Sequence, residues 1–156
     1  MIADIEALQT QIKQRLVFYK YQMKREPSLQ SIAQLISTIL YSRRFFPYYS
    51  FNLLFGLDEE GNGTVYGYDA IGSYDKMMYG VQGSGIQLIV PIFDNQFKDF
   101  NVINPKLIEN VELSVETIRD AMHSCTEREI HTGDYMDIAL IKREGITTTR
   151  EELRKD

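Results

Sequence analysis

The sequence has 156 residues, 44% of them hydrophobic and 25% charged, with a formal net charge of −5, which is typical of a single globular domain. The acidic balance argues against a nucleic-acid-binding protein, which would present a basic face, and no apolar run approaches the ~18 residues of a membrane span. Cys125 is the single cysteine, so an internal disulfide is excluded and a reducing, intracellular compartment is favoured.

Residues 1–24 predict an amphipathic helix, because apolar residues recur at steps of three or four. This stripe consists of Ile5, Leu8, Ile12, Leu16, Tyr19 and Met23. Pro27 ends the helix, and Ser28 is a typical N-cap for a second helix that extends to about Arg44. Arg43 and Arg44 then fall in its last turn, where cations suit the helix dipole, and we favour that role over anion binding. Two helices so closely joined are expected to lie antiparallel and to cover one face of a sheet.

The middle of the chain predicts a three-stranded antiparallel meander. The predicted strands are residues 51–56, 65–68 and 74–81, and the turns between them are residues 58–63 and 69–73. Because Leu54 interrupts the polar side of an otherwise alternating first strand, both faces of this sheet are expected to be covered by other layers.

The second half predicts two further helices. Residues 84–87, Ser-Gly-Ile-Gln, match a capping box, and we favour Ser84 as a helix N-cap over an anion site or a catalytic serine. Residues 101–110 are polar and predict a surface loop. Ser114 is expected to cap the last helix, and Gly133 is expected to end it.

Two strands, residues 135–142 and 146–149, follow the last helix. The order is therefore two helices, three strands, two helices and two strands, with no internal repeat and no linker. This order predicts an α+β fold with two stacked sheets, although the pattern alone leaves a single mixed sheet open.

Several segments carry a family resemblance. Residues 41–49 read YSRRFFPYY and residues 56–61 read GLDEEG. The supporting pieces are Gly72-Ser73-Tyr74, Gly83-Ser84-Gly85, Asp94-Asn95-Gln96, Thr132-Gly133-Asp134 and Leu153-Arg154-Lys155-Asp156. Together they resemble the eukaryotic 20S proteasome beta subunit family over essentially the whole chain. The resemblance implies a four-layer αββα sandwich of the N-terminal nucleophile hydrolase type, truncated at its N-terminus. Residues 1–156 would then form one proteasome beta-type domain without the family's first strands.

The resemblance also bears on catalysis. Active members of the family use an N-terminal threonine whose own amine acts as base, assisted by residues of the early strands, whereas this chain starts with Met1 in a predicted helix. Ser84 matches a serine that lies near the nucleophile in those enzymes. Glu129 and Thr132 stand where active members have an Asp and a Ser that support the active site. We therefore expect no catalytic residue in this chain, and expect these three positions to be a vestigial supporting shell.

No cofactor or metal is expected. His123 and His131 lie eight residues apart, which is not a helical zinc-ligand spacing, and His131 with Asp134 is a weak candidate for a metal site or a Ser–His–Asp arrangement. Residues 61–63, Gly-Asn-Gly, are not a phosphate loop, because no strand-to-helix step follows them.

The expected function is therefore that of a non-catalytic structural subunit of the beta ring of the 20S proteasome core, which completes the chamber for ATP- and ubiquitin-dependent protein degradation in cytoplasm and nucleus. The expected partners are other beta subunits in a heteroheptameric ring, the alpha ring and the opposite beta ring, with no nucleic acid and no membrane. The alternative is a truncated sequence of an active N-terminal threonine hydrolase beta subunit. A free-standing binding module is a third reading.

Overall fold

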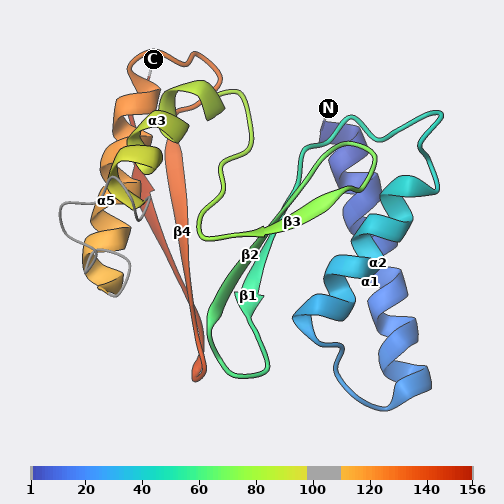
Figure 1. Ribbon diagram of the computed structural model, residues 1–156. Helices are drawn as coiled ribbons and strands as arrows, with labels where there is room; N and C mark the ends of the chain where they lie inside the picture. Colours follow the sequence, from blue (N-terminus) through green and yellow to red (C-terminus); the bar gives the residue numbers. More distant parts are fainter. Residues whose placement is uncertain (1, 98–109, 156) are drawn as a thin grey trace. The chain divides into compact units, whose positions relative to one another are not determined.

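A computed structural model describes residues 2–97 and 110–155 (Figure 1). The chain divides into two compact units, Met1–Met77 and Met78–Asp156, and each is described by itself. The surface loop predicted at residues 101–110 lies outside the described residues except for Asn110.

The first unit begins with two helices, α1 (Ile2–Met23) and α2 (Leu29–Tyr41), which form the antiparallel pair that the sequence predicts (Figure 1). Ser28 is the N-cap of α2, as predicted, and its side chain accepts a hydrogen bond from the Ser31 backbone N–H. The predicted end at Arg44 is wrong. From Arg43 on, backbone hydrogen bonds between residues three apart replace the α-helical pattern, so both arginines lie in a turn beyond the helix.

The predicted meander is confirmed as a sheet of order β1-β2-β3, with both pairs antiparallel. Its strands are β1 (Leu53–Leu57), β2 (Gly63–Tyr68) and β3 (Tyr74–Met77). The third strand ends at Met77 rather than at Val81. Met77 pairs with Val65, which lies near the start of β2, so little partner strand remains for the chain to pair with.

Helices α1 and α2 cover one face of this sheet, as predicted (Figure 1). The buried core of the unit consists of Leu8, Ala33, Ile36, Ile39, Leu40, Tyr48 and Tyr68. Two tyrosines tie distant segments together, because the Tyr68 hydroxyl donates to the Ala33 carbonyl and the Tyr48 hydroxyl donates to Gln11 Oε1. Burial raises the pKa of Tyr68, so this phenol remains a neutral hydrogen-bond donor.

The second unit contains helices α3 (Ile86–Phe97) and α5 (Val111–Thr126), which pack on each other. Their shared core consists of Ile89, Phe93, Phe97, Ala121 and Cys125. The predicted cap of the last helix at Ser114 is wrong. Asn110 is the cap, because its side chain accepts from the backbone N–H groups of Glu112 and Leu113.

The last helix also ends earlier than predicted. It stops at Thr126, and a backbone hydrogen bond from Arg128 to the Cys125 carbonyl begins a turn, so Gly133 is not its C-cap. Gly133 instead comes just before β4, where a Cβ atom would lie 3.0 Å from the Arg154 carbonyl oxygen.

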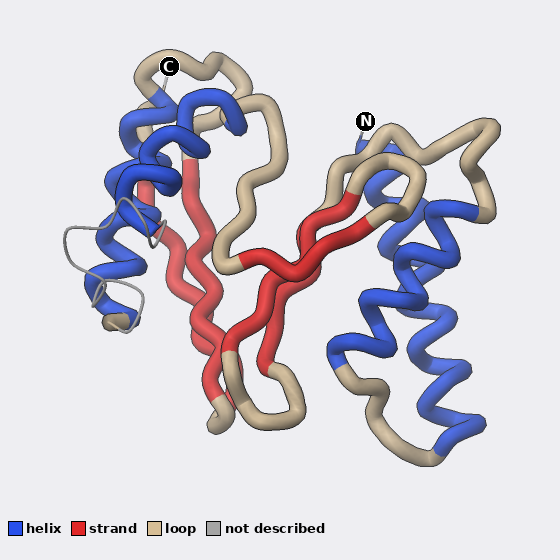
Figure 2. The backbone as a smooth tube through the Cα atoms, in the orientation of Figure 1, coloured by secondary structure: helices blue, strands red, loops and turns tan. Residues whose placement is uncertain are grey.

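Two antiparallel strands, β4 (Tyr135–Lys142) and β5 (Gly145–Glu152), form a long hairpin (Figure 2). The bounds of β4 agree with the prediction, whereas β5 is longer than residues 146–149. Arg119 of α5 makes two hydrogen bonds to the Glu151 carboxylate, at 2.6 and 2.7 Å, and so attaches the hairpin to the helix. The helices and antiparallel strands confirm the α+β class. Among the described residues, no helix is long and apolar enough to cross a membrane.

Candidate functional site

The structure brings Ser84, Glu129 and Thr132 together, although 45 residues separate the first two. The Ser84 hydroxyl donates to Glu129 Oε2 at 2.7 Å, and the Thr132 hydroxyl donates to the same oxygen at 3.2 Å. Ser84 lies on the loop before α3, and the other two lie on the turn after α5. The Glu129 carboxylate therefore joins two segments that are distant in sequence.

Ser84 does not cap α3. The helix begins at Ile86, and Gly85 is the residue before it, so Ser84 lies one position too early. Its hydroxyl points instead to Glu129. The anion-site reading of this loop is also disfavoured, because an anion at Ser84 would meet a carboxylate that already accepts its hydroxyl.

Gly85 explains why the loop can lie so close to α5. An added Cβ atom at Gly85 would lie 2.4 Å from Cys125 Sγ, a separation that real Cβ atoms essentially never show. Both residues are buried. The absence of a side chain at residue 85 therefore lets the Ser84 loop pack directly against the end of the helix that precedes Glu129.

Sequence reasoning considered His131 only with Asp134 and missed its contact with Glu129. Its backbone N–H donates to Glu129 Oε2 and its ring Nδ1 donates to Glu129 Oε1, each at 3.0 Å. The two-residue spacing from Glu129 is the one signal that could have indicated this contact. Asp134, which the sequence suggested as a neighbour, instead pairs through its backbone with Leu153 and Arg154.

The order of this cluster decides what it can do chemically. In a Ser–His–Asp triad the imidazole lies between the hydroxyl and the carboxylate, so that it can take the proton of the hydroxyl. Here the carboxylate of Glu129 lies between Ser84 and His131. The imidazole is therefore not placed to activate Ser84.

Electrostatics make Glu129 a poor general base as well. The hydrogen bond from the His131 side chain, followed by that from Ser84, lowers the pKa of Glu129 from 4.5 to about 2. Only 13% of its side chain is exposed. An ionised carboxylate that is saturated with donors and barely basic suits a structural junction better than proton transfer.

This junction gives a pH prediction. The folded-state pKa of Glu129 is depressed, so its contribution to stability is present above about pH 4.5 and is lost as the pH falls toward about 2. Glu129→Gln should unfold more readily than the wild type at neutral pH and should lose less further stability over that acidic interval. Urea unfolding at a series of pH values measures both effects.

The matched control is Glu59→Gln, which removes an exposed carboxylate from the turn between β1 and β2. This variant should follow the acid response of the wild type. Equal acid sensitivity in Glu129→Gln and the wild type would contradict the junction described for Glu129.

Metal ligation has no support in the part of the chain that the structure describes. No group of three or more His, Cys, Asp or Glu side chains there could hold an ion. The predicted pair His131 and Asp134 does not converge, because His131 faces Glu129.

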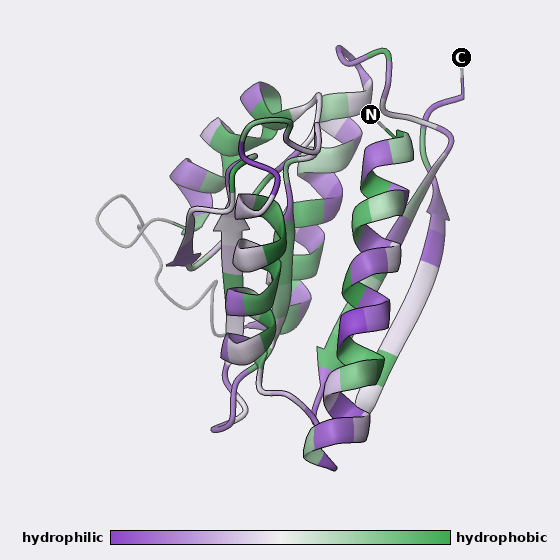
Figure 3. Ribbon diagram, turned by 90° about the vertical axis from the view of Figure 1, so that its right-hand side faces the viewer, coloured by the Kyte–Doolittle hydropathy of each residue, from purple (hydrophilic) through white to green (hydrophobic). Residues whose placement is uncertain are grey.

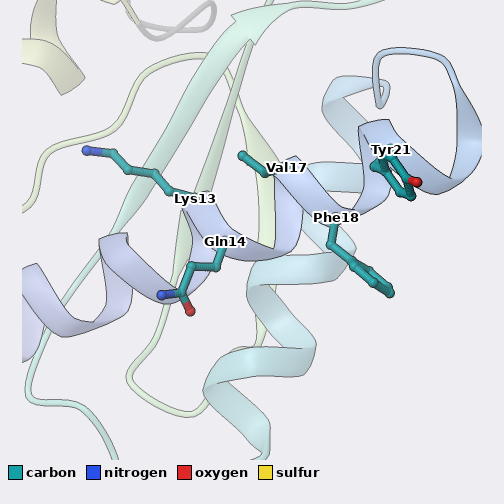
Figure 4. A pocket seen from close by; sticks show the side chains of 5 residues that line it. All are labelled: Lys13, Gln14, Val17, Phe18 and Tyr21. Atoms are coloured by element: carbon teal, nitrogen blue, oxygen red, sulfur yellow. The ribbon is translucent and has the colours of Figure 1, made fainter.

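A second surface of interest is the outer side of α1 (Figure 3). It carries a shallow pocket lined by Lys13, Gln14, Val17, Phe18 and Tyr21 (Figure 4). The apolar stripe predicted for this helix did not include its exposed apolar side chains, of which Tyr21 is 83% exposed. Aromatic side chains are enriched at protein interfaces relative to the rest of the surface.

Comparison with known proteins identifies the family. The family described as "Proteasome subunit" matches residues 1–141. A relative from Arabidopsis thaliana, named proteasome subunit beta type-1, is 47% identical over 159 residues, which cover 99% of this chain and 71% of the relative. The chain belongs to the proteasome subunit family.

Two further members of the proteasome subunit family indicate the same subunit type, which is numbered differently in the two naming schemes. Proteasome subunit beta type-1 of Dictyostelium discoideum is 40% identical and covers all of this chain and 67% of its own length. The probable proteasome subunit beta type-6 of Schizosaccharomyces pombe is 35% identical and covers 99% of this chain and 72% of its own length. The residues of the sequence resemblance predict the same type, beta type-6, called beta type-1 in the mammalian scheme, and this prediction is confirmed.

Proposed function

We propose that this chain is a non-catalytic structural subunit of the 20S proteasome core. It completes the beta ring around the proteolytic chamber, and neighbouring subunits carry out the proteolysis. The single observation that carries this proposal is the similarity, over nearly the whole chain, to subunits named proteasome subunit beta type-1. Assembly with other proteasome subunits follows from family membership.

The non-catalytic role is supported by the chemistry of the Glu129 junction. The three positions that match the family's supporting shell, Ser84, Glu129 and Thr132, hydrogen-bond to one another. A carboxylate with a pKa of about 2 accepts no proton at neutral pH. We read this shell as vestigial for catalysis and retained for packing.

The proposal extends to the fold. We propose one beta-type domain over residues 1–156, built as a four-layer αββα sandwich. The three-stranded sheet supports this architecture, because Phe55, Val65 and Met77 are paired neighbours on the face opposite the one on which helices α1 and α2 pack. Phe55 is 53% exposed within the described chain. An apolar sheet face of this kind calls for a second layer.

The partner surfaces follow from the same proposal. The outer side of α1, with Val17, Phe18 and Tyr21, is assigned to the alpha ring, together with the turn at residues 24–27. The surfaces of α3 and α5 are assigned to the opposite beta ring, and other beta subunits complete a heteroheptameric ring. Such a particle would operate in cytoplasm and nucleus.

One experiment tests both the assembly and the lack of catalysis. The chain, tagged at its C-terminus in its own cells, should co-purify with intact 20S particles. A peptide vinyl sulfone, which labels nucleophilic threonines, should label other subunits but not this chain. Ser84→Ala should leave peptide hydrolysis per assembled particle unchanged.

Two outcomes would contradict the proposal in different ways. A tagged chain that never enters 20S particles would refute the structural role. Labelling of this chain by the vinyl sulfone would refute the non-catalytic role and support an active N-terminal threonine hydrolase.

A further inference from the structure

The strongest unassigned feature is the arginine–aromatic turn, defined as residues 41–51, which connects α2 to β1. Its exposed aromatic side chains are Tyr41, Phe45, Phe46, Tyr49 and Phe51. Phe45 is 88% exposed and Phe46 is 84% exposed, although two adjacent phenylalanines would bury substantial area in a core. Single exposed apolar residues need no explanation, but five exposed rings within eleven residues of one segment indicate an interaction surface.

The arginine–aromatic turn is held in a fixed conformation. Phe46 N–H donates to the Arg43 carbonyl at 2.9 Å, and Arg44 N–H donates to the Tyr41 carbonyl at 3.1 Å. At its far end, Tyr49 N–H donates to Asp4 Oδ2 on α1 at 3.0 Å. A surface that is already ordered loses little conformational entropy when a partner binds.

The charges of the arginine–aromatic turn are stacked on rings. The Arg43 guanidinium lies 4.9 Å from the centre of the Tyr48 ring, and the Arg44 guanidinium lies 4.4 Å from the centre of the Phe45 ring. Among the described residues, neither arginine forms an ion pair with a carboxylate. The chain as a whole carries a net charge of −5, so this turn is a basic spot on an acidic protein.

Aromatic and arginine side chains are the residues that dominate binding energy at protein interfaces. Stacking holds Arg43 and Arg44 in position, and Arg44 Nη1 also donates to the Tyr41 hydroxyl at 2.7 Å, which leaves the other N–H groups of the Arg44 guanidinium for a partner. Arginine pairs with carboxylates through two parallel hydrogen bonds. The chemistry of the turn therefore calls for a partner with an apolar pocket for the rings and carboxylates at its edge.

We propose that the arginine–aromatic turn docks into a neighbouring proteasome subunit, which presents an apolar pocket edged by acidic side chains. Phe45 and Phe46 fill the pocket, and Arg43 and Arg44 pair with the carboxylates. This inference rests on the proposed function, because it assigns one contact by which the subunit is held in the particle.

Replacement of the two rings tests the docking. The full chain carrying Phe45→Ser and Phe46→Ser is expressed in its own cells beside the wild type, and its share in purified 20S particles is measured. Incorporation should fall by at least about tenfold, since both anchors are lost. Ile146→Ser is the control, because it removes an apolar side chain that is 68% exposed in β5, outside the turn. This control should incorporate normally.

Charge reversal tests the second half of the proposal. Arg43→Glu with Arg44→Glu should reduce incorporation far more than it lowers the thermal stability of the chain, because the two side chains contact aromatic rings and the Tyr41 hydroxyl but form no ion pair within the described chain. A fall in the unfolding temperature large enough to explain the lost incorporation would assign the effect to folding and overturn the docking role.

A photoreactive benzophenone amino acid in place of Phe46 identifies the occupant. Irradiation of assembled particles should join this chain to one other subunit. Adducts between two copies of this chain, or no adduct in assembled particles, would overturn the proposal. Absence of the wild-type chain from 20S particles would refute the proposed function. If the wild type is incorporated and the Phe45→Ser, Phe46→Ser variant is incorporated equally well, this inference alone is refuted.

Discussion

Gly72→Ala is expected to destabilise the unit Met1–Met77 strongly. Gly72 has a φ of +91°, which an L side chain rarely adopts, so alanine would strain the backbone. The added Cβ atom would also lie 2.5 Å from the Ser37 carbonyl oxygen and 3.1 Å from Leu40 Cβ, both on α2. A helix backbone cannot give way as a flexible side chain can. We expect a loss of about 4 kcal/mol from strain and overlap combined.

The consequence reaches beyond the turn itself. Asp69 holds this turn in place, since its Oδ1 accepts from the backbone N–H groups of Ile71 and Ser73. Movement of residue 72 away from α2 would therefore pull on β2 and β3, and Tyr68 would lose its hydrogen bond to Ala33. Urea unfolding followed by circular dichroism measures the loss.

Gly63→Ala is the matched control for Gly72→Ala. Gly63 begins β2, and an added Cβ atom would meet nothing within 4 Å. Its φ lies outside the left-handed region, so alanine should change stability by less than about 1 kcal/mol. Similar unfolding midpoints for the two variants would show that the contact between the turn and α2 is not as close as described.

The turn at Gly72 shows what the sequence can and cannot predict about the fold. Residues 69–73 are recognisable as a turn from their composition alone. The contact of Gly72 with Ser37 could not be predicted, because the two residues are 35 positions apart and meet only when α2 packs on the sheet. The same limit explains why periodicity predicts α1 and the bounds of β4 well, whereas the end of β3 depends on its partner strand.

Helix ends are less predictable from this sequence than helix interiors, for a local reason. Asn110 and Ser114 are both good N-cap residues, and only the observed hydrogen bonds to Glu112 and Leu113 select Asn110. Ser84 fits a capping box equally well, but its hydroxyl finds a carboxylate instead. Competition between a local cap and a distant partner cannot be decided from the sequence.

The candidate site was predictable only in part. The family resemblance singled out Ser84, Glu129 and Thr132, and the structure brings these three residues together. The family resemblance gave no indication that His131 donates two hydrogen bonds to the same Glu129 carboxylate. That contact depends on the turn after α5, which sequence reasoning had assigned to the helix.

Gly85→Ala is the second variant with a large expected effect, because residue 85 separates the Ser84 loop from α5. The new Cβ atom would overlap Cys125 Sγ, and Cys125 is 1% exposed and packed in the core of its unit. We expect a loss of about 2 kcal/mol from this overpacking. The displaced loop should also weaken the hydrogen bond from Ser84 to Glu129, so the variant should lose part of the acid response that Glu129 gives the wild type.

Cys125→Ala provides a test of cause, because it removes the sulfur that the new methyl group would strike. The single change should cost about 1 kcal/mol through the lost side-chain volume. Combined with Gly85→Ala, it should make room for the methyl group, so the double variant should be more stable than the two single losses predict. Losses that simply add would place the strain elsewhere, and would show that the close approach of Gly85 to Cys125 does not hold the Ser84 loop against α5.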